Sequence, residues 1–553
     1  MRPSVDENSL QNRLGTVYSP VIVTTPGAAG LSAWRWWTSS AAVIVLVILG
    51  IGFRTYALAG DRNLWIDESM LALNLVQRSP AQLLEPLDLN QGAPVGFLLL
   101  TKAVITQLGV TERTFRLVPF LGSILGLMAF AWLAPRLLPR PAAILGLGLL
   151  TVSPYLISYS AECKQYATDA ALTVGLFAAA VRLLRGAVGR WHWVGLGAAG
   201  AVAVWFSHPA AFVLGGIGTA LLAEAMWNRD RRRFLAAAGT VAAWVVSFGV
   251  CYLVSLRHLG NNQFLLDYWN GHFLSLPPKG LGDLAWLLDH FFAPFGYPAG
   301  LAGTEIRSGG IAAVLFIVGV WGMWKERWPV AVAIVLPGVL ALLASGFHKY
   351  PFAGRLLLFL VPIMVLGVAR GAWMIGSSLR TTQPVAAVVL LGVLIAAPCL
   401  EAYSELRRPM RVEQLNPLLA KVRQEWRPGD RMYVYYGAAP AFAFYTRNNP
   451  FPADAVLIGR EARENRTEYR EQLVQMKGLS RVWLVFSHRH KHEESDIRAH
   501  AEGLGRCEQV EQTAGAAAYL FNFAVAPETG VGGEPIAPDR ESTRGAIIRG
   551  GDR

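Results

Sequence analysis

Two adjacent carboxylates stand at the start of the first polar loop of this chain, in the sequence Asn63-Leu64-Trp65-Ile66-Asp67-Glu68-Ser69. The apolar run before them, Trp36 to Phe53, has 18 residues and no charge, which is enough for one membrane crossing. Carboxylates beside a bilayer are costly to desolvate and contribute nothing to packing. Chemistry at the membrane surface therefore explains Asp67 and Glu68 better than architecture does, and an ordinary solvated loop is the alternative.

The composition is that of a membrane protein. Of 553 residues, 53% are hydrophobic and 16% are charged, whereas soluble domains carry about 25% charged residues. The net charge of +12 lies in short Arg and Lys clusters between apolar runs, which indicates membrane topology and excludes nucleic-acid binding. The first apolar run follows about 35 polar residues, so it is expected to be an uncleaved anchor. Four scattered cysteines predict neither a disulfide framework nor a metal motif.

Eleven runs are long enough to cross about 30 Å of hydrocarbon. They lie near residues 36–56, 117–135, 141–160, 165–181, 191–207, 209–227, 234–256, 308–324, 328–347, 353–374 and 383–402. A twelfth candidate, 92–110, is broken by Lys102 and preceded by Gln91-Gly92-Ala93-Pro94. Whether this segment crosses decides the orientation of everything after it.

The basic clusters favour a model in which 92–110 does not cross. One side then receives Arg136, Arg140, Arg182, Arg185, Arg190, Arg229, Arg231, Arg232, Arg233, Lys325, Arg327 and Arg380. That side is the cytoplasm by the positive-inside rule, together with the N-terminal segment 1–35. The outer side receives the loops 57–115 and 257–307 and everything after Glu401. We therefore expect 92–110 to be juxtamembrane or re-entrant.

The pattern changes after the last run. Residues 403–525 combine a helical stretch, Val412 to Glu425, with strand-like runs at 431–436 and 481–486. Residues 526–553 are rich in Gly, Pro, Glu and Arg and are expected to be a disordered tail. The predicted fold is a polytopic α-helical membrane protein, with a transmembrane domain at 36–402 of about 11 transmembrane helices and a small extracytoplasmic α/β domain at the C-terminal end.

With this threading, polar residues from distant parts of the chain gather at the outer face. They are Asp67, Glu68, Glu112, Arg116, Glu162, Lys164, His208, His348, Lys349, Tyr350 and Arg355. Such a gathering of carboxylates and cations is what a site for an anionic, membrane-embedded substrate would need.

Several of these residues have a plainer explanation. Lys164 and Arg355 lie at helix ends and could simply extend to lipid headgroups. Asp169 lies inside an apolar run and shares a helical face with Glu162, so it is either functional or hydrogen-bonded to a neighbouring helix. His208 precedes a proline, which is typical of a helix end.

Short motifs in this order resemble the GT-C membrane glycosyltransferases. They are the early acidic pair, the Pro-containing segment after it, Arg116-Leu117-Val118-Pro119, and Ser153-Pro154-Tyr155 leading into Tyr159-Ser160-Ala161-Glu162. The group that they resemble is glycosyltransferase family 39 with its bacterial relatives, the protein O-mannosyltransferases and lipid A aminoarabinose transferases. The resemblance covers about residues 36–400. The family's Tyr-Ser-Arg-Glu-Ala-Arg-like stretch reads Tyr-Ser-Ala-Glu-Cys-Lys here, so its first Arg is absent and its second is Lys164.

The resemblance implies transfer of a sugar from a polyprenyl-phosphate carrier to an acceptor hydroxyl on the outer face, with inversion. By position, Asp67 matches the catalytic base and Glu68 its neighbour or acceptor orienter. Cations would stabilise the leaving phosphate. The phosphate-binding set would be Lys164, Lys349, Arg355 and Arg116. Tyr166 and Tyr350 could line the sugar or carrier path, although a membrane-interface aromatic belt is the alternative. Glu162, Asp169, His208 and His348 complete the predicted substrate site.

Two other classes of function remain in competition. A lipid or lipid-linked sugar flippase also places charges in the membrane, but typically near the midplane and with inverted repeats. A polysaccharide polymerase or ligase would depend chiefly on cations, which the Asp67-Glu68 pair argues against. No obligatory cofactor is predicted. If a divalent metal ion were used, Asp67, Glu68 and His208 would be its first ligands. The expected partners are a polyprenyl-phosphate sugar, a lipid, glycan or protein acceptor, and the bilayer of a bacterial cytoplasmic membrane.

Overall fold

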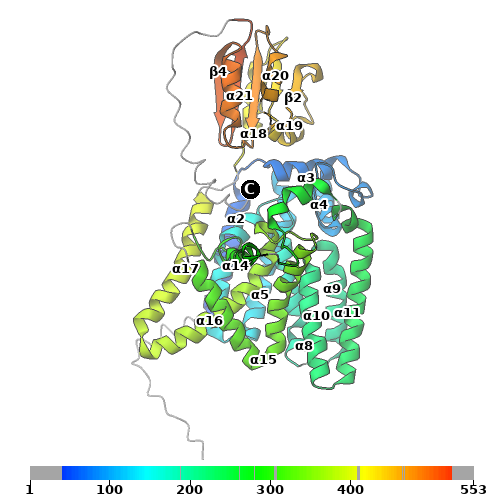
Figure 1. The fold of residues 1–553 in the computed structure, drawn as a ribbon, viewed down its shortest axis with the longest axis vertical. Helices are drawn as coiled ribbons and strands as arrows, with labels where there is room; N and C mark the ends of the chain where they lie inside the picture. The colour runs from blue at the N-terminus through cyan, green and yellow to red at the C-terminus, as the bar shows by residue number, and fades with distance from the viewer. Residues whose placement is uncertain are drawn as a thin grey trace, which may run out of the picture.

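The computed structural model describes residues 40–525, except 187–188, 261, 279, 304–307, 408–411, 464 and 466. The predicted N-terminal segment 1–35 and the tail 526–553 lie outside the described residues. A helical membrane part carries a small C-terminal α/β domain on one of its two faces (Figure 1). We call that face the domain side.

The membrane part is built from long apolar helices. They are α2 (Ser40–Ala59), α5 (Glu112–Leu137), α6 (Arg140–Thr151), α7 (Pro154–Ser160), α8 (Tyr166–Leu184), α9 (Arg190–Phe206), α10 (Ala210–Trp227), α11 (Arg231–Cys251), α15 (Gly309–Gly346), α16 (Val361–Thr382) and α17 (Pro384–Arg407). Within the described residues, eight helices meet the length and hydropathy of a membrane span, and the bent pair α6 and α7 makes a ninth. The chain is thus a multi-pass membrane protein.

Two further features bring the count to the eleven predicted crossings. Helix α9 has 17 residues and is only just shorter than the helices counted above. Helix α15 has 38 residues, but its backbone leaves helical geometry at Arg327, so it consists of two helices joined by a kink. The predicted break between 324 and 328 coincides with this kink. Pro329 lies two residues after Arg327, and its ring removes a backbone donor where the second helix begins.

The segment 92–110 forms a short helix rather than a span. Helix α4 (Val95–Leu108) has 14 residues and a length of about 21 Å at 1.5 Å per residue, less than the hydrocarbon thickness. It begins after Pro94 and ends at Gly109, whose φ of 90° favours glycine. If α4 does not cross the membrane, the helix ends that carry the basic clusters lie on one face, and the loop that carries Asp67 lies on the opposite face.

Glycine permits the close contact between α15 and α16. A Cβ atom at Gly371 would lie 1.8 Å from the Leu315 carbonyl oxygen, and one at Gly319 would lie 1.9 Å from the Gly367 carbonyl oxygen. Only glycine allows backbones to approach so closely, as small residues do between membrane helices generally. Helix α16 is continuous with the 3-10 segment η6 (Gly354–Leu360), so this packing also fixes the segment that carries Arg355.

Smaller elements occupy the domain side of the membrane part. The first loop holds α3 (Ile66–Gln77), η3 (Gln82–Leu84) and α4. The loop after α11 holds the π-helical turn η4 (Tyr252–Leu256), α12 (Arg257–Leu259), α13 (Gln263–Tyr268), η5 (Asn270–His272) and α14 (Leu281–Gly296).

The C-terminal domain contains one five-stranded sheet in the order β2-β1-β3-β5-β4. Strand β1 is parallel to β2 and β3, whereas β5 is antiparallel to β3 and β4. The strands are β1 (Arg431–Val434), β2 (Val456–Ile458), β3 (Val482–Ser487), β4 (Arg506–Thr513) and β5 (Ala516–Asn522). The predicted strand-like runs therefore became β1 and β3, the two central parallel strands.

Helices cover both faces of this sheet. Helices α18 (Leu415–Glu425) and α19 (Ala439–Thr446) pack with Trp483 and Val485 of β3 on one face. Helices α20 (Thr467–Val474) and α21 (Glu493–Glu502) pack with the alternate residues Leu484 and Phe486 on the other. Because both faces are buried, β3 is a continuous apolar run, as expected of a central strand in an α/β sheet. Short 3-10 turns η7 (Tyr436–Ala438) and η8 (Ala453–Ala455) complete the domain.

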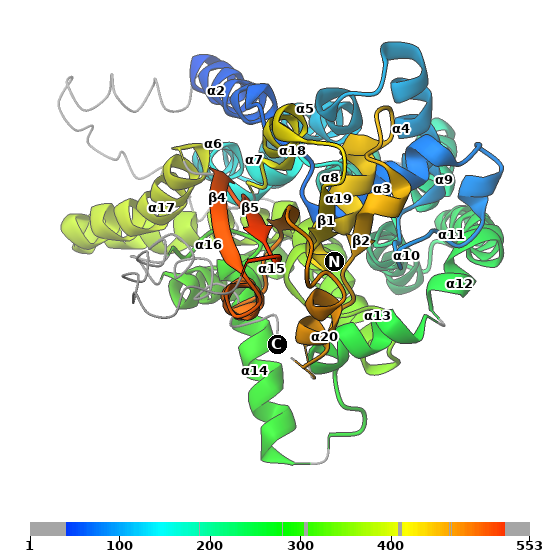
Figure 2. The ribbon, with the colours of Figure 1, turned by 90° about the horizontal axis from the view of Figure 1, so that it is seen from above.

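The C-terminal domain contacts the first loop of the membrane part. Tyr445 of α19 accepts a hydrogen bond from the Leu64 amide (2.7 Å) and donates one to Glu112 (3.0 Å). Phe444 meets Phe115 edge to face, with ring centroids 5.7 Å apart. Helix α19 lies against α3, which Figure 2 shows from above. The domain is thus attached beside the segment that carries Asp67.

Candidate active site

An ion pair between Asp67 and Arg355 is the centre of the candidate site. Asp67 lies in the first turn of α3, where the helix dipole favours a negative charge. Arg355 lies in η6, far away in the sequence. Its Nη1 is 2.7 Å from Asp67 Oδ2, and the two side chains are 18% and 20% exposed. Both groups are ordered by the protein yet remain accessible to a substrate.

Two aromatic rings border the Arg355 guanidinium. Its central carbon lies 5.8 Å from the Trp65 ring centroid and 5.7 Å from the Tyr166 ring centroid. Aromatic faces attract cations through the ring quadrupole. Trp65 comes from the residues before α3, and Tyr166 begins α8, so these rings hold Arg355 between two separate parts of the fold.

Lys164 supplies a second cation to this site. It is buried, and its Nζ donates a hydrogen bond to the Gln91 side-chain oxygen over 2.7 Å. Burial lowers the pKa of Lys164 and nearby Arg355 lowers it further, while Asp67 opposes both. Asp67, Arg355 and Lys164 are thus close enough for their charges to interact, and together they bring two cations and one carboxylate to the domain side.

Glu68 does not share the Asp67–Arg355 contact and instead forms a buried ion pair with Arg116. Nε and Nη2 of Arg116 donate to the two Glu68 oxygens over 2.9 and 2.7 Å, and Glu68 also accepts the Cys163 amide over 2.6 Å. Burial alone would raise the pKa of Glu68, but Arg116 holds it below the usual value. The Arg116 guanidinium also donates to the carbonyls of Arg62 and Asn63.

The predicted roles of Glu68 and Arg116 are therefore not those that the geometry favours. The Arg116 guanidinium already donates hydrogen bonds to Glu68 and to backbone carbonyls, so it is poorly placed to hold a phosphate. Glu68 is 1% exposed and is likewise engaged, so it does not reach an acceptor. This pair instead connects α3, α5 and the turn before α8, and it positions Asp67. Glu162 is buried in the same turn, at 2% exposure.

Three more predicted residues lie near helix ends. Asp169 is in the first turn of α8, His208 follows α9, and Tyr350 is in the turn before η6. Asp169 is 5% exposed, lies beside Ser207, and interacts electrostatically with Tyr350. The Tyr350 hydroxyl donates to the Leu356 carbonyl over 2.6 Å, next to Arg355. Burial lowers the pKa of His208 to about 4, so this imidazole is neutral at physiological pH.

His348 and Lys349 are less closely associated with the centre. Both are exposed on the turn that follows α15. The His348 ring lies 4.8 Å from the Phe273 ring, and the Lys349 ammonium lies near Gly260, so both face the loop after α11. Of the four cations expected to hold a phosphate, the structure brings Lys164 and Arg355 together beside Asp67. Arg116 is paired with Glu68, and Lys349 lies at the edge.

Three residues of the site were not predicted from the sequence. Trp65 borders Arg355, and Gln91 holds Lys164. His488, from the loop after β3, lies over Trp65 with ring centroids 6.3 Å apart, and its Nδ1 is 2.8 Å from Glu413. The sequence offered some indication of Gln91, because it begins the polar Gln91-Gly92-Ala93-Pro94 stretch that interrupts the apolar run before α4. The other two depend on tertiary contacts that no local pattern shows.

The residues suspected as metal ligands do not come together. Asp67 pairs with Arg355 and Glu68 pairs with Arg116. Across the described part of the chain, no group of three His, Cys, Asp or Glu side chains is placed to hold a metal ion.

Comparison with known proteins gives structural neighbours only. No protein-family model matches the chain, and no curated protein does. ArnT from Cupriavidus metallidurans bound to undecaprenyl phosphate superposes with a TM-score of 0.51 and 15% identity, over 89% of this chain and 98% of that one. Its apo form gives a TM-score of 0.50 and 14% identity, over 90% and 100%.

An oligosaccharyltransferase from Archaeoglobus fulgidus, solved with Zn and sulfate, superposes with a TM-score of 0.51 and 11% identity, over 86% of this chain and 72% of that one. These neighbours have the fold that the motifs predicted. The membrane part described above, with its C-terminal domain on one face, therefore has the fold of the GT-C glycosyltransferases.

Proposed function

We propose that this protein is a membrane glycosyltransferase that moves a sugar from a polyprenyl-phosphate carrier to an acceptor hydroxyl. The observation that carries the proposal is the gathering of Asp67, Arg355 and Lys164 at one end of the helices. A carboxylate can accept a proton, and two cations can hold a phosphate. The fold shared with ArnT, which was solved bound to undecaprenyl phosphate, supports this class of donor.

The reaction that we propose is a single displacement with inversion. The acceptor oxygen bonds to the anomeric carbon while the bond from that carbon to the phosphate oxygen breaks. The acceptor proton passes to the Asp67 carboxylate, and the electron pair of the broken bond stays on the polyprenyl phosphate. Arg355 and Lys164 stabilise the charge that develops there. No general acid is required because the leaving group is already an anion.

The reaction is proposed to take place outside the cytoplasm, at the cytoplasmic membrane of a bacterium. The supporting observation is the arginine asymmetry. The helix ends opposite the domain side carry Arg136, Arg182, Arg233 and Arg380, and the positive-inside rule assigns such a face to the cytoplasm. The domain side, with Asp67, would then face outward.

Binding of undecaprenyl phosphate to the full-length protein tests this proposal. The wild type should gain thermal stability as the lipid is added. Lys164→Ala and Arg355→Ala should each weaken binding by about ten- to a hundredfold, since a hydrogen bond to a charged group contributes roughly 1.5–3 kcal/mol. Lys421→Ala is the matched control, because Lys421 forms an exposed ion pair with Glu511 in the C-terminal domain. A wild type that does not respond to the lipid, or normal binding by both Lys164→Ala and Arg355→Ala, would contradict the proposal.

A further inference from the structure

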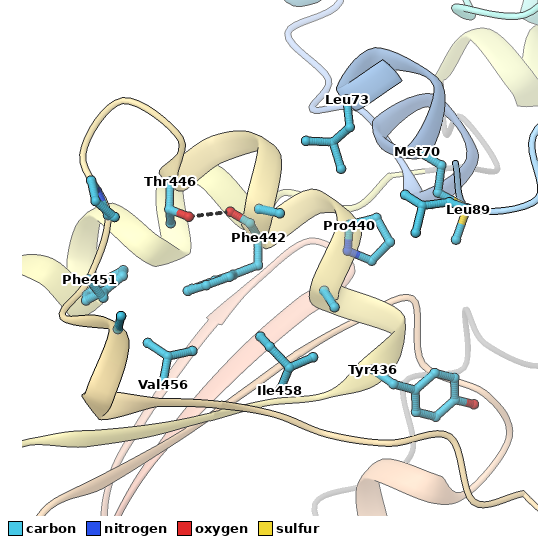
Figure 3. Close-up of a pocket in the computed structure, with 14 residues that line it drawn as sticks. Met70, Leu73, Leu89, Tyr436, Pro440, Phe442, Thr446, Phe451, Val456 and Ile458 are labelled. Atoms are coloured by element: carbon cyan, nitrogen blue, oxygen red, sulfur yellow. Dashed lines mark hydrogen bonds between the residues drawn. The ribbon is translucent and has the colours of Figure 1, made fainter. Parts of the chain in front are cut away.

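An apolar groove runs between the C-terminal domain and the first loop of the membrane part (Figure 3). It has a volume of about 590 Å³, within the usual range for small-molecule sites. Met70 and Leu73 of α3 form one wall, and Pro440 and Phe442 of α19 form the facing wall. Val456 and Ile458 of β2 lie beyond Phe442.

The polar side chains of this groove already have partners within the protein. The Thr446 hydroxyl donates to the Phe442 carbonyl over 2.7 Å. The Tyr436 hydroxyl donates to Glu493 over 2.9 Å and accepts from Arg463 over 2.8 Å. Because these side chains have satisfied hydrogen bonds and the other lining side chains are apolar, the groove suits hydrocarbon better than a polar glycan.

The groove opens one helical turn from the candidate base. Met70 follows Asp67 by three residues on α3, so both lie on the same side of that helix. Gln91 connects the two places, since its amide group contacts the Met70 sulfur over 3.3 Å and its oxygen holds Lys164. Tyr436 and Ile458 stand at the carboxyl ends of β1 and β2, the edge at which α/β sheets bind ligands.

The first loop, which forms one wall of the groove, also carries exposed leucines on α4. Leu89, at the groove, is 44% exposed. In the same loop, Leu100 and Leu108 of α4 are 45% and 62% exposed. Exposed leucines on a short helix at the end of a membrane bundle are expected to lie in the bilayer interface. A molecule in the groove could therefore keep part of its hydrocarbon in the membrane.

We infer that this groove seats a hydrocarbon chain of the acceptor, and that the acceptor is a lipid whose headgroup hydroxyl reaches Asp67. The inference rests on the proposed function, since it assigns the second substrate of that same site. A lipid fits better than a peptide because the lining offers apolar contact without free side-chain hydrogen-bonding groups. It also fits the exposed leucines of the same loop, Leu89 at the groove and Leu100 and Leu108 on α4.

A photoactivatable dodecyl glucoside, with a diazirine at the end of its alkyl chain, tests the groove in the full-length protein in nanodiscs. Mass spectrometry should locate the label in residues 436–458 of the wild type. Ala443 is exposed in the groove, so Ala443→Trp should fill it and reduce that labelling by about tenfold, the loss expected from displacing about two methylene groups. Val474→Trp, at a position that is 45% exposed on α20, is the matched control and should label normally.

Two readouts separate the failure of this inference from the failure of the proposed function. Ala443→Trp should keep the thermal response to undecaprenyl phosphate, because the donor cations are untouched. Labelling confined to the membrane helices, or unchanged in Ala443→Trp, would overturn the acceptor groove while the donor response stood. Displacement of the probe by an apolar strand-forming peptide, but not by unlabelled lipid, would overturn it in favour of a peptide beside β2. A wild type without a donor response would overturn the proposed function and the acceptor assignment together.

Discussion

Replacing Asp67 by Asn should abolish transfer and at the same time strengthen binding of the donor phosphate. The amide keeps the shape of the side chain but cannot accept a proton, and loss of a general base costs about a hundredfold or more in rate. Without substrate, the Asp67 carboxylate forms an ion pair with Arg355, with Oδ2 and Nη1 2.7 Å apart. The carboxylate would therefore compete with an incoming phosphate for the Arg355 guanidinium. Its removal frees that guanidinium.

The geometry of the pair sets the size of the effect on binding. Both side chains keep about one-fifth of their surface exposed, so solvent screens their interaction more than that of the fully buried Glu68–Arg116 pair. Solvent-screened pairs contribute about 1 kcal/mol at most, which corresponds to about fivefold tighter binding of undecaprenyl phosphate by Asp67→Asn. For the same reason, the thermal midpoint should change by about 2 °C or less.

Glu68→Gln is the matched control, because it changes the adjacent carboxylate, which is fully buried whereas Asp67 is partly exposed. The Glu68 and Arg116 side chains are 1% and 2% exposed, and removal of one charge leaves the other buried without compensation. Such a loss costs roughly 3–5 kcal/mol, so the thermal midpoint should fall several times further than in Asp67→Asn.

The assay is sugar transfer from a polyprenyl-phosphate donor, with the thermal midpoint and undecaprenyl-phosphate affinity measured on the same preparations. A folded Asp67→Asn protein that transfers at the wild-type rate would refute the assignment of the base. Loss of transfer in Glu68→Gln without loss of stability would exchange the two roles. Equal destabilisation by both substitutions would refute the distinction between an accessible and a buried ion pair.

Three further predictions concern the cations and the topology. Because burial lowers the pKa of Lys164, its ammonium should lose its proton at a lower pH than an exposed lysine, and phosphate affinity should fall as pH rises through that value. Lys164→Arg should keep its affinity to higher pH, and an unchanged pH profile would contradict the role of Lys164. Lys349→Ala should bind undecaprenyl phosphate within about twofold of the wild type, since Lys349 faces the loop near Gly260, and a loss equal to that of Arg355→Ala would show otherwise. A reporter fused after Val525 should be active only outside the cytoplasm, and activity of a cytoplasm-specific reporter there would reverse the threading.

The membrane fold was largely predictable because its signal is local. Apolar runs about 18 residues long must form helices in a bilayer, and Arg and Lys clusters must separate to one face. Even the break inside α15 was visible, since Arg327 and Pro329 interrupt the apolar run. The central strands β1 and β3 were equally visible as apolar runs, because a strand buried on both faces has few polar residues.

The partners within the site were less predictable because they come from distant segments. Periodicity indicates which face a residue occupies but not which side chain it meets there. Glu68 and Asp67 are adjacent in the sequence, yet successive residues of α3 point in different directions, so one meets Arg116 and the other meets Arg355. A motif that begins with Arg116 could be matched to a family without showing that its guanidinium is already engaged by Glu68.

The accessible charges of the site fit the proposed reaction at both its beginning and its end. One carboxylate and two cations give Asp67, Arg355 and Lys164 a net charge of plus one, which matches the single negative charge of a sugar-phosphate diester. As the sugar leaves, the released polyprenyl phosphate becomes a monoester with nearly two negative charges. At the same moment Asp67 takes up the acceptor proton and becomes neutral, so the protein groups rise to a net charge of plus two. Local compensation is therefore kept throughout the transfer, and the buried pair of Glu68 and Arg116 adds no net charge. A site with only one cation would leave about one negative charge of the dianionic product uncompensated in a partly buried place, which is why the burial of Lys164 beside Asp67 is the feature on which the mechanism most depends.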